Sequence, residues 1–214
     1  MPLSVVGALT VYALAIRAPP DAAIRPFVAS SDALPVSRLI DRAFIPAEGY
    51  NPLQRAAIIA ETFFSLNERS SNSSNLMLVC CDVEDSSKIM GFVECFLGGS
   101  GTNTLPKRLR GLDHPHISSL AVDASMRRRG IAESLVRAIE GDVVRGFEKD
   151  AAEQQRKKKI SLEVEEDNDA ALGLYTDKLG YEVTHRDADG RKLVGDVFFG
   201  RSERCVKLTL EKQF

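Results

Sequence analysis

A basic turn at residues 122–132 is the segment whose residue types point most directly to chemistry. It reads Val-Asp-Ala-Ser-Met-Arg-Arg-Arg-Gly-Ile-Ala, so an apolar strand pattern passes through three arginines into a helical pattern that opens at Gly130. The first N–H groups of a helix lack partners within the helix and attract anions. A glycine there lets a ligand approach the backbone without meeting a Cβ atom. The segment therefore predicts a cradle for phosphate or pyrophosphate.

Two common phosphate-binding motifs do not fit this turn. A P-loop needs a Gly-Lys-Ser or Gly-Lys-Thr step, and the glycine here is followed by isoleucine and alanine. The three-glycine spacing of dinucleotide-binding folds is absent as well. Taken alone, three arginines fit a solvated surface turn about as well as a ligand site, so the remainder of the sequence has to decide.

Two spaced motifs make the sequence similar to the GCN5-related N-acetyltransferases, the GNAT superfamily. Arg127, Gly130 and Ala132 match its signature Gln/Arg-x-x-Gly-x-Gly/Ala. A second family motif, a Leu-Glu-Val strand followed by an Asn-capped helix with a tyrosine, matches residues 162–181. The two motifs together cover residues 116–182 and look most like the ribosomal-protein N-terminal acetyltransferases and the plastid members.

The resemblance implies acetyl-CoA as the cosubstrate and no metal ion. In the family, the pyrophosphate binds at the basic turn, and the pantetheine arm lies like an added strand beside the strand before it. The residues expected to contact the cofactor are Leu120, Ala121, Val122, Arg127, Arg128, Arg129, Gly130, Ile131, Ala132, Glu133 and Asn168.

The resemblance also assigns two catalytic positions. Tyr175 stands where the family places the general acid that protonates the departing CoA thiolate. Glu163 stands where the ribosomal-protein enzymes place the base, and Glu94 or a water molecule is the alternative base. A backbone N–H at a bulge near Val122 is expected to bind the oxyanion of the tetrahedral intermediate.

The reaction needs a neutral amine, because an ammonium group has no lone pair to attack the thioester. A lysine with a pKa of ~10.4 is about 0.1% neutral near pH 7.4, which costs roughly 4 kcal/mol. An α-amine with a pKa of ~8 loses under about 1 kcal/mol. A carboxylate can remove the proton directly or through a water, and no covalent enzyme intermediate is required.

The elements that must position these residues form an α/β pattern. The resemblance implies the GNAT fold, a mixed central sheet of about seven strands, splayed between the fourth and fifth, with about four flanking helices. Ser31 and Asp32 are expected to cap the first helix. The apolar periodicities predict helices from about residues 33, 52 and 130 and at 168–179, and strands at 23–29, 76–83, 89–97, 116–122, 160–164, 181–185 and 204–210.

Composition excludes several other classes of protein. The 214 residues are 44% hydrophobic and 27% charged with a net charge of −2, which argues against a nucleic-acid-binding protein. The sequence has no apolar run of the ~18–20 residues that a membrane span needs. The four cysteines fall in apolar runs and are expected to be small buried hydrophobic residues in a reducing compartment. The three histidines complete no zinc spacing, so no metal site is expected.

Residues 1–22 are expected to be an N-terminal extension of an acetyltransferase domain at 23–214. The uncharged run at 3–16 fits a targeting segment or an extra element packed on the domain. Together with the likeness to plastid proteins it predicts a plastid location, with the cytoplasm as the alternative. The loop at 98–115, with three basic residues, fits a solvated surface or a substrate entrance. The basic run at 156–159 is expected at the end of the long helix.

The sequence thus leads to one main functional hypothesis and two alternatives. The main hypothesis is transfer of an acetyl group from acetyl-CoA to a protein amine, an N-terminal α-amine or a lysine, by direct attack in a ternary complex. The first alternative is a small-molecule amine acetyltransferase. The second is a catalytically silent domain that senses acetyl-CoA. The sequence does not indicate the oligomeric state.

Overall fold

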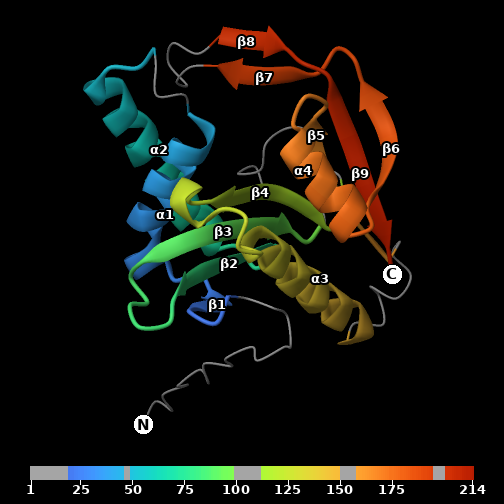
Figure 1. The fold of residues 1–214 in the computed structure, drawn as a ribbon, viewed down its shortest axis with the longest axis horizontal. Helices are drawn as coiled ribbons and strands as arrows, with labels where there is room; N and C mark the ends of the chain where they lie inside the picture. Colours follow the sequence, from blue (N-terminus) through green and yellow to red (C-terminus); the bar gives the residue numbers. More distant parts are fainter. Residues whose placement is uncertain (1–18, 46–48, 99–111, 150–157, 195–200) are drawn as a thin grey trace.

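A seven-stranded mixed sheet in the order β1-β2-β3-β4-β5-β9-β6 forms the centre of the fold (Figure 1). The computed structural model describes residues 19–45, 49–98, 112–149, 158–194 and 201–214. The strands of the sheet are β1 Ala22–Pro26, β2 Asn75–Asp82, β3 Ile89–Phe96, β4 His116–Val122, β5 Lys159–Glu165, β6 Glu182–Asp187 and β9 Lys207–Gln213. The helices are α1 Ala29–Phe44, α2 Pro52–Ser70, α3 Ile131–Lys149 and α4 Asp169–Gly173.

Each face of the sheet is covered by its own helices. Side chains alternate across a strand, so Met77 and Val79 of β2 pack with α1 and α2, while Leu78 and Cys80 pack with α3. The cluster on the α3 face also contains Tyr175 and other residues next to α4. The sheet therefore separates an α1–α2 face from an α3–α4 face.

The sheet is split between its fourth and fifth strands, as the sequence predicts. β4 and β5 run parallel and pair only at His116 with Ser161 and at Ile117 with Leu162. Beyond these two pairs the strands separate. On either side of the split the pairing is antiparallel, through β3 to β4 and through β5 to β9. The predicted mixed seven-stranded sheet is thus confirmed.

The N-cap predicted for the first helix is wrong. Val28 is the N-cap residue of α1, and Asp32 lies inside the first turn. The Asp32 carboxylate accepts a hydrogen bond from the Val28 backbone N–H (2.8 Å) and pairs with Arg25 on β1. Burial alone would raise the pKa of Asp32, but the hydrogen bond and charge of Arg25 lower it overall. A buried ion pair to the sheet thus places Asp32 one turn further into the helix.

The C-terminal third departs from the prediction in four places. The helix expected at 168–179 is α4 followed by a π-helical turn, η4 Leu174–Lys178. Lys159, expected at a helix end, opens β5 and pairs with Glu211 of β9. A two-stranded sheet of β7 Arg191–Val194 and β8 Arg201–Arg204 was not predicted, and the last strand begins three residues later than expected.

Several other expectations concern the cysteines and segments that lie outside the described residues. Cys80, Cys81 and Cys95 are buried, as predicted, and burial raises the pKa of Cys80 to about 12. Cys205 is half-buried between β8 and β9. The apolar run at 3–16, most of the basic loop and residues 156–157 lie outside the described residues. Within the part of the chain that is described, no helix is long and apolar enough to cross a bilayer.

Gly91 on β3 gives the first test, because it lets α3 approach the sheet closely. A Cβ atom there would lie 2.8 Å from Ile131 Cγ2 and 2.9 Å from Leu135 Cδ1. Overpacking of this kind costs about 1–3 kcal/mol, so Gly91→Ala should lower the free energy of unfolding by that amount in urea titrations. Gly146→Ala is the control, because a Cβ there meets nothing within 4 Å and should stabilise the helix. Equal effects of the two substitutions would contradict the packing described here.

Candidate active site

The turn after β4 leads into a helix that begins next to Gly130, as the sequence predicts. A short 3-10 turn, η2 Ala124–Met126, leads from the strand to the arginines. Gly130 has a φ of 84°, and Arg128, a non-glycine residue, has a φ of 63°. A left-handed non-glycine residue costs about 1–2 kcal/mol, and such strain gathers at functional sites. α3 then starts at Ile131, so its first N–H groups open at this turn.

The three arginines of the turn are held differently. Arg129 makes a two-point ion pair with Asp21, at 2.9 and 2.7 Å from the two carboxylate oxygens. The hydrogen bond from Arg129 is the main reason that the pKa of Asp21 is lowered. Arg127 donates from Nε to the Val122 carbonyl at 3.3 Å, and Arg128 is exposed. Arg128 therefore presents its charge to solvent, while much of the charge of Arg129 is already neutralised.

The segment Leu120–Val122 lies along the split. On one side it pairs with Val93, Phe92 and Gly91 of β3. On the other side the pairing with β5 has already ended at Ile117. The backbone groups that would have bonded to β5 therefore face the opening. Such groups are obligatory hydrogen-bonding partners and accept an extended ligand as an additional strand.

Ser118, not Val122, is the bulged residue of β4. The register shifts between Glu94, which pairs with Ser119, and Cys95, which pairs with Ile117. The extra residue lies near the point where β4 and β5 part. The bulge predicted near Val122 is therefore misplaced, and the irregular backbone lies closer to the closed end of the split.

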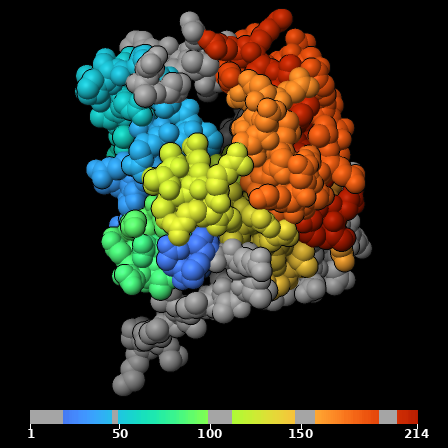
Figure 2. Space-filling view, in the orientation of Figure 1, coloured from blue at the N-terminus to red at the C-terminus, as the bar shows by residue number. Residues whose placement is uncertain are grey.

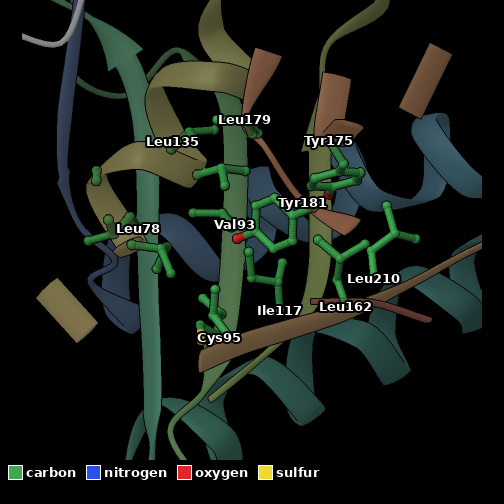
Figure 3. Close-up of a cluster of buried hydrophobic side chains, with 14 of the residues drawn as sticks. Leu78, Val93, Cys95, Ile117, Leu135, Leu162, Tyr175, Leu179, Tyr181 and Leu210 are labelled. Atoms are coloured by element: carbon green, nitrogen blue, oxygen red, sulfur yellow. The ribbon is translucent and has the colours of Figure 1, made fainter. Parts of the chain in front are cut away.

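Tyr175 lies in the π-helical turn and points into the core on the α3–α4 face (Figure 3). Its ring packs edge-on against Tyr181, with the centroids 5.6 Å apart. Burial raises the pKa of the Tyr175 phenol. A phenol with the ordinary pKa of ~10 is already protonated at neutral pH. A protonated phenol at this place is suited to donate a hydrogen ion to a leaving group.

Glu163 lies on the opposite face of the sheet from Tyr175. Its neighbours Leu162 and Val164 belong to the cluster that contains Tyr175, so the alternation of β5 turns Glu163 to the α1–α2 side. The Glu163 carboxylate lies 3.5 Å from Lys207 Nζ on β9. The two predicted catalytic residues thus flank the split from its two faces and do not share one pocket wall.

Glu94, the alternative base, is buried on β3 beneath α2. Its carboxylate lies 2.9 Å from Arg69 Nε. Burial raises the pKa of Glu94, and the charge of Arg69 opposes that shift only in part. Glu94 is therefore committed to a buried ion pair between β3 and α2, whereas Glu163 is partly exposed.

Asn168 and Arg137 organise the α4 side of the split. The Asn168 side chain accepts a hydrogen bond from the Ala171 N–H and so caps α4. Arg137 of α3 donates to the Lys178 carbonyl at the end of the π-helical turn (2.9 Å) and pairs with Glu133. The sequence analysis missed Arg137, although its spacing of four residues from Glu133 signals a helical ion pair.

The space-filling view shows a hollow between the two halves of the chain (Figure 2). It opens above the yellow turn, between the blue α1 region and the orange C-terminal half. The described residues contain no group of three or more His, Cys, Asp or Glu side chains able to hold a metal ion. The region thus contains a basic turn at a helix start, a strand edge that β5 leaves unpaired beyond Ile117, a buried phenol and a carboxylate.

Comparison with known proteins identifies the family. Residues 42–181 match the model of the acetyltransferase (GNAT) family. Arabidopsis thaliana NAA60 in complex with acetyl-CoA is similar in structure, with a TM-score of 0.61 and 16% identity over 90% of this chain and 98% of that one. The ribosomal-protein-S18-alanine N-acetyltransferase from Escherichia coli has a TM-score of 0.57 and 16% identity over 90% and 93%.

A third similar structure is the NatC complex bound to Gag peptide and CoA, with a TM-score of 0.57 and 19% identity over 91% of this chain and 99% of that one. The sequence matches no curated protein. Because the family model covers most of the chain, the chain belongs to the acetyltransferase (GNAT) family. It therefore has the fold of an acyltransferase that uses acetyl-CoA.

Gly130 gives the second test, because its backbone conformation shapes the anion cradle. Replacement of Gly130 by alanine forces a Cβ atom into the left-handed region at the start of α3. The variant should bind CoA about tenfold more weakly, in line with a cost of about 1–2 kcal/mol. Isothermal titration calorimetry with CoA measures this directly. Unchanged affinity in a folded Gly130→Ala protein would mean that the ligand phosphates bind elsewhere.

Proposed function

We propose that this protein transfers the acetyl group of acetyl-CoA to a peptide amine by direct attack in a ternary complex. The observation that carries the proposal is the β4–β5 split, which has a basic turn at one end and the candidate acid and base on opposite faces of the sheet. The cofactor arm can then lie along the open edge of β4 while the amine approaches from the α1–α2 face. This separation suits a reaction that needs both substrates bound together.

The basic turn fixes the orientation of the cofactor in this proposal. Pyrophosphate at residues 127–133 places the pantetheine arm beside Leu120–Val122, where β4 offers unpaired backbone groups. The thioester end then lies toward the bulged residue Ser118. That position is near the point where the strands part, and Tyr175 and Glu163 lie on the two opposite faces of the sheet.

The proton balance explains why both faces need a titratable group. An ammonium substrate loses two N–H protons in becoming an amide, and the CoA thiolate gains one. Tyr175 would donate to the sulfur as the C–S bond breaks and regain a proton from solvent. Glu163 would accept the first proton from the ammonium group, directly or through a water, because its carboxylate is on the open α1–α2 side.

The similar structures favour a peptide acceptor over a small amine. One of them was solved with a Gag peptide and CoA, and another is named for the alanine of a ribosomal protein. Between the peptide amines, an α-amine has the smaller deprotonation cost. The proposal therefore covers N-terminal α-amines and lysines, with α-amines the easier substrates.

The experiment that tests the function is a thiol-release assay with acetyl-CoA and two peptide sets. One set offers free α-amines with blocked lysines, and the other offers lysines with blocked α-amines. Release of CoA with either set supports the proposal and ranks the two amine classes. If neither set causes CoA release and the protein still binds acetyl-CoA, the result would instead support a small-molecule amine acetyltransferase or an acetyl-CoA sensor.

Tyr175→Phe should lower kcat by roughly 10²–10⁴-fold, because it removes the proton donor from the α3–α4 face. The KM for acetyl-CoA should stay the same, since the ring still fills its place in the core. Tyr181→Phe is the matched control, a neighbouring buried tyrosine that loses the same atom. If the two variants have equal kcat in steady-state assays, Tyr175 is a packing residue only.

Glu163→Gln should also lower kcat, by roughly 10²-fold or more, because the amide cannot accept a proton from the amine. Glu165→Gln is its control, since Glu165 lies on the same strand and pairs with Lys192 at 2.7 Å. The loss in Glu163→Gln should shrink as pH rises and the amine deprotonates by itself. A loss that is constant from pH 7 to 10 would argue against a role in deprotonation.

A further inference from the structure

A pocket of about 360 Å³ lies between α1, the turn that joins β2 to β3, and the turn after β4. Figure 2 shows these segments side by side, with α1 in blue, the β2–β3 turn in green and the turn after β4 in yellow. Among the described residues, Asp123, Ser125 and Met126 line the pocket, whereas none of residues 127–133 does. A volume of this size is in the range of small-molecule sites. The pocket is therefore separate from the start of α3, where the cofactor phosphates are proposed to bind.

The rim of the pocket is basic. Arg38 and Arg42 lie one turn apart on α1, and Lys88 comes from the end of the β2–β3 turn. All three residues are exposed to solvent. Val36 and Leu39 of the same helix are buried in the core, so packing fixes the helix face that carries the two arginines. A ligand in solvent can therefore reach three cationic side chains around one pocket.

The positive charges of this rim are only partly balanced. Arg42 pairs with Asp123 at 3.1 Å, and Lys88 pairs with Asp82 at 3.1 Å. Arg38 makes no hydrogen bond or ion pair with any residue that the structure describes. A guanidinium group carries five N–H donors, so Arg42 also keeps donors beyond its one bond to Asp123. Three cations thus face two carboxylates, which leaves one positive charge in excess.

The other polar groups of the pocket already have partners. One Asp123 oxygen accepts from the Ser125 backbone N–H (3.0 Å) and hydroxyl (2.6 Å), and the other accepts from Arg42. The Ser87 hydroxyl donates to Asp85 at 2.6 Å. The donors left for a ligand are therefore those of the three basic side chains, which favours a ligand that accepts hydrogen bonds and carries negative charge.

The remainder of the lining is apolar. Pro35, Ile89 and Met126 line the pocket and are half-buried. Guanidinium planes and thioethers both make favourable contacts with aromatic rings. A phosphate monoester is close to a dianion at neutral pH and has three acceptor oxygens, enough for several basic side chains. An apolar wall below a basic rim thus fits a ligand with a phosphate head and an apolar body.

We propose that this pocket binds a small organic phosphate, a phosphate monoester with an apolar or aromatic body. The phosphate oxygens accept hydrogen bonds from Arg38, from the free N–H groups of Arg42 and from Lys88. The body of the ligand packs against Pro35 and Met126. This site is additional to the cofactor site, and its occupancy can be measured whether or not the protein transfers acetyl groups.

An NMR titration of the ¹⁵N-labelled full-length protein with phenyl phosphate tests the site. The amide signals of Ser87, Lys88 and Ser125 should shift until they saturate, while those of Gly130 and Ile131 should stay unchanged. Benzoate has the same ring with a singly charged carboxylate and should bind about tenfold more weakly. Inorganic phosphate lacks the ring and should also bind about tenfold more weakly.

Arg38→Gln should weaken the binding of phenyl phosphate about tenfold, because it removes the cation that has no carboxylate partner. Arg204→Gln is the matched control, since Arg204 is exposed on β8, outside the pocket, and lies 3.9 Å from Asp189. The control variant should keep the affinity of the unmodified protein. The amide spectrum of each variant shows whether it is folded.

Several results would overturn the proposal. The pocket would not be the site if its amide signals did not shift, if the shifts centred on Gly130, or if folded Arg38→Gln protein kept full affinity. Displacement of phenyl phosphate by CoA would mean that the pocket is part of the cofactor site. Equal binding of benzoate or of inorganic phosphate would refute the ligand class. If Arg38→Gln does not fold, the titration of the unmodified protein still locates the site.

Discussion

The site depends on one constraint, which is that β4 and β5 hold together for only two residue pairs and then separate. A strand in the middle of a sheet normally satisfies its backbone groups on both sides. Here the last part of β4 is bonded to β3 alone, and its other edge is open inside the molecule. An extended ligand can form backbone hydrogen bonds with an open edge of this kind. The basic turn at the end of β4 favours a ligand that carries negative charge.

Opening a sheet in the middle would weaken the fold if nothing else crossed the opening. The core on the α3–α4 face does so, because one continuous cluster contains residues of β2, β3 and β4 as well as residues of β5 and β9. Arg137 of α3 reaches the Lys178 carbonyl, and Glu140 of α3 pairs with Lys212 of β9 at 3.0 Å. Contacts of α3 with both halves of the sheet thus stabilise the fold where β4–β5 hydrogen bonds are missing. The opposite face can stay open for the second substrate.

The sequence predicted the parts of the site that follow one another along the chain. The strand at 116–122, the basic turn and the glycine that opens α3 all come from local pattern, and the structure has them at the expected positions. The motif likeness also placed Glu163 and Tyr175 correctly on a strand and a helical segment. Alternation along β5 puts Glu163 on the face away from Tyr175, which could be deduced only once the neighbours Leu162 and Val164 were known to pack in the cluster with Tyr175.

The remaining features arise from contacts between distant segments, so local pattern did not reveal them. Asp32 lies inside the helix and not at the predicted cap position, because it forms an ion pair with Arg25 on β1. Lys159 became part of a strand because Glu211 of β9 lies beside it. The cluster of His114, His116 and Ser161 exists only because β4 and β5 meet there. Predictions from local sequence pattern therefore failed most often for charged or polar residues whose partners are distant in the sequence.

Backbone hydrogen exchange with and without acetyl-CoA tests the central claim most directly. If the cofactor arm adds to the open edge of β4, binding should slow exchange at Leu120–Val122 and at the first residues of α3, and should leave α1 and α2 unchanged. Slowed exchange confined to α1 and α2, with β4 and the basic turn unaffected, would contradict the account. The ligand would then bind elsewhere, and the split would be a structural feature without a part in catalysis.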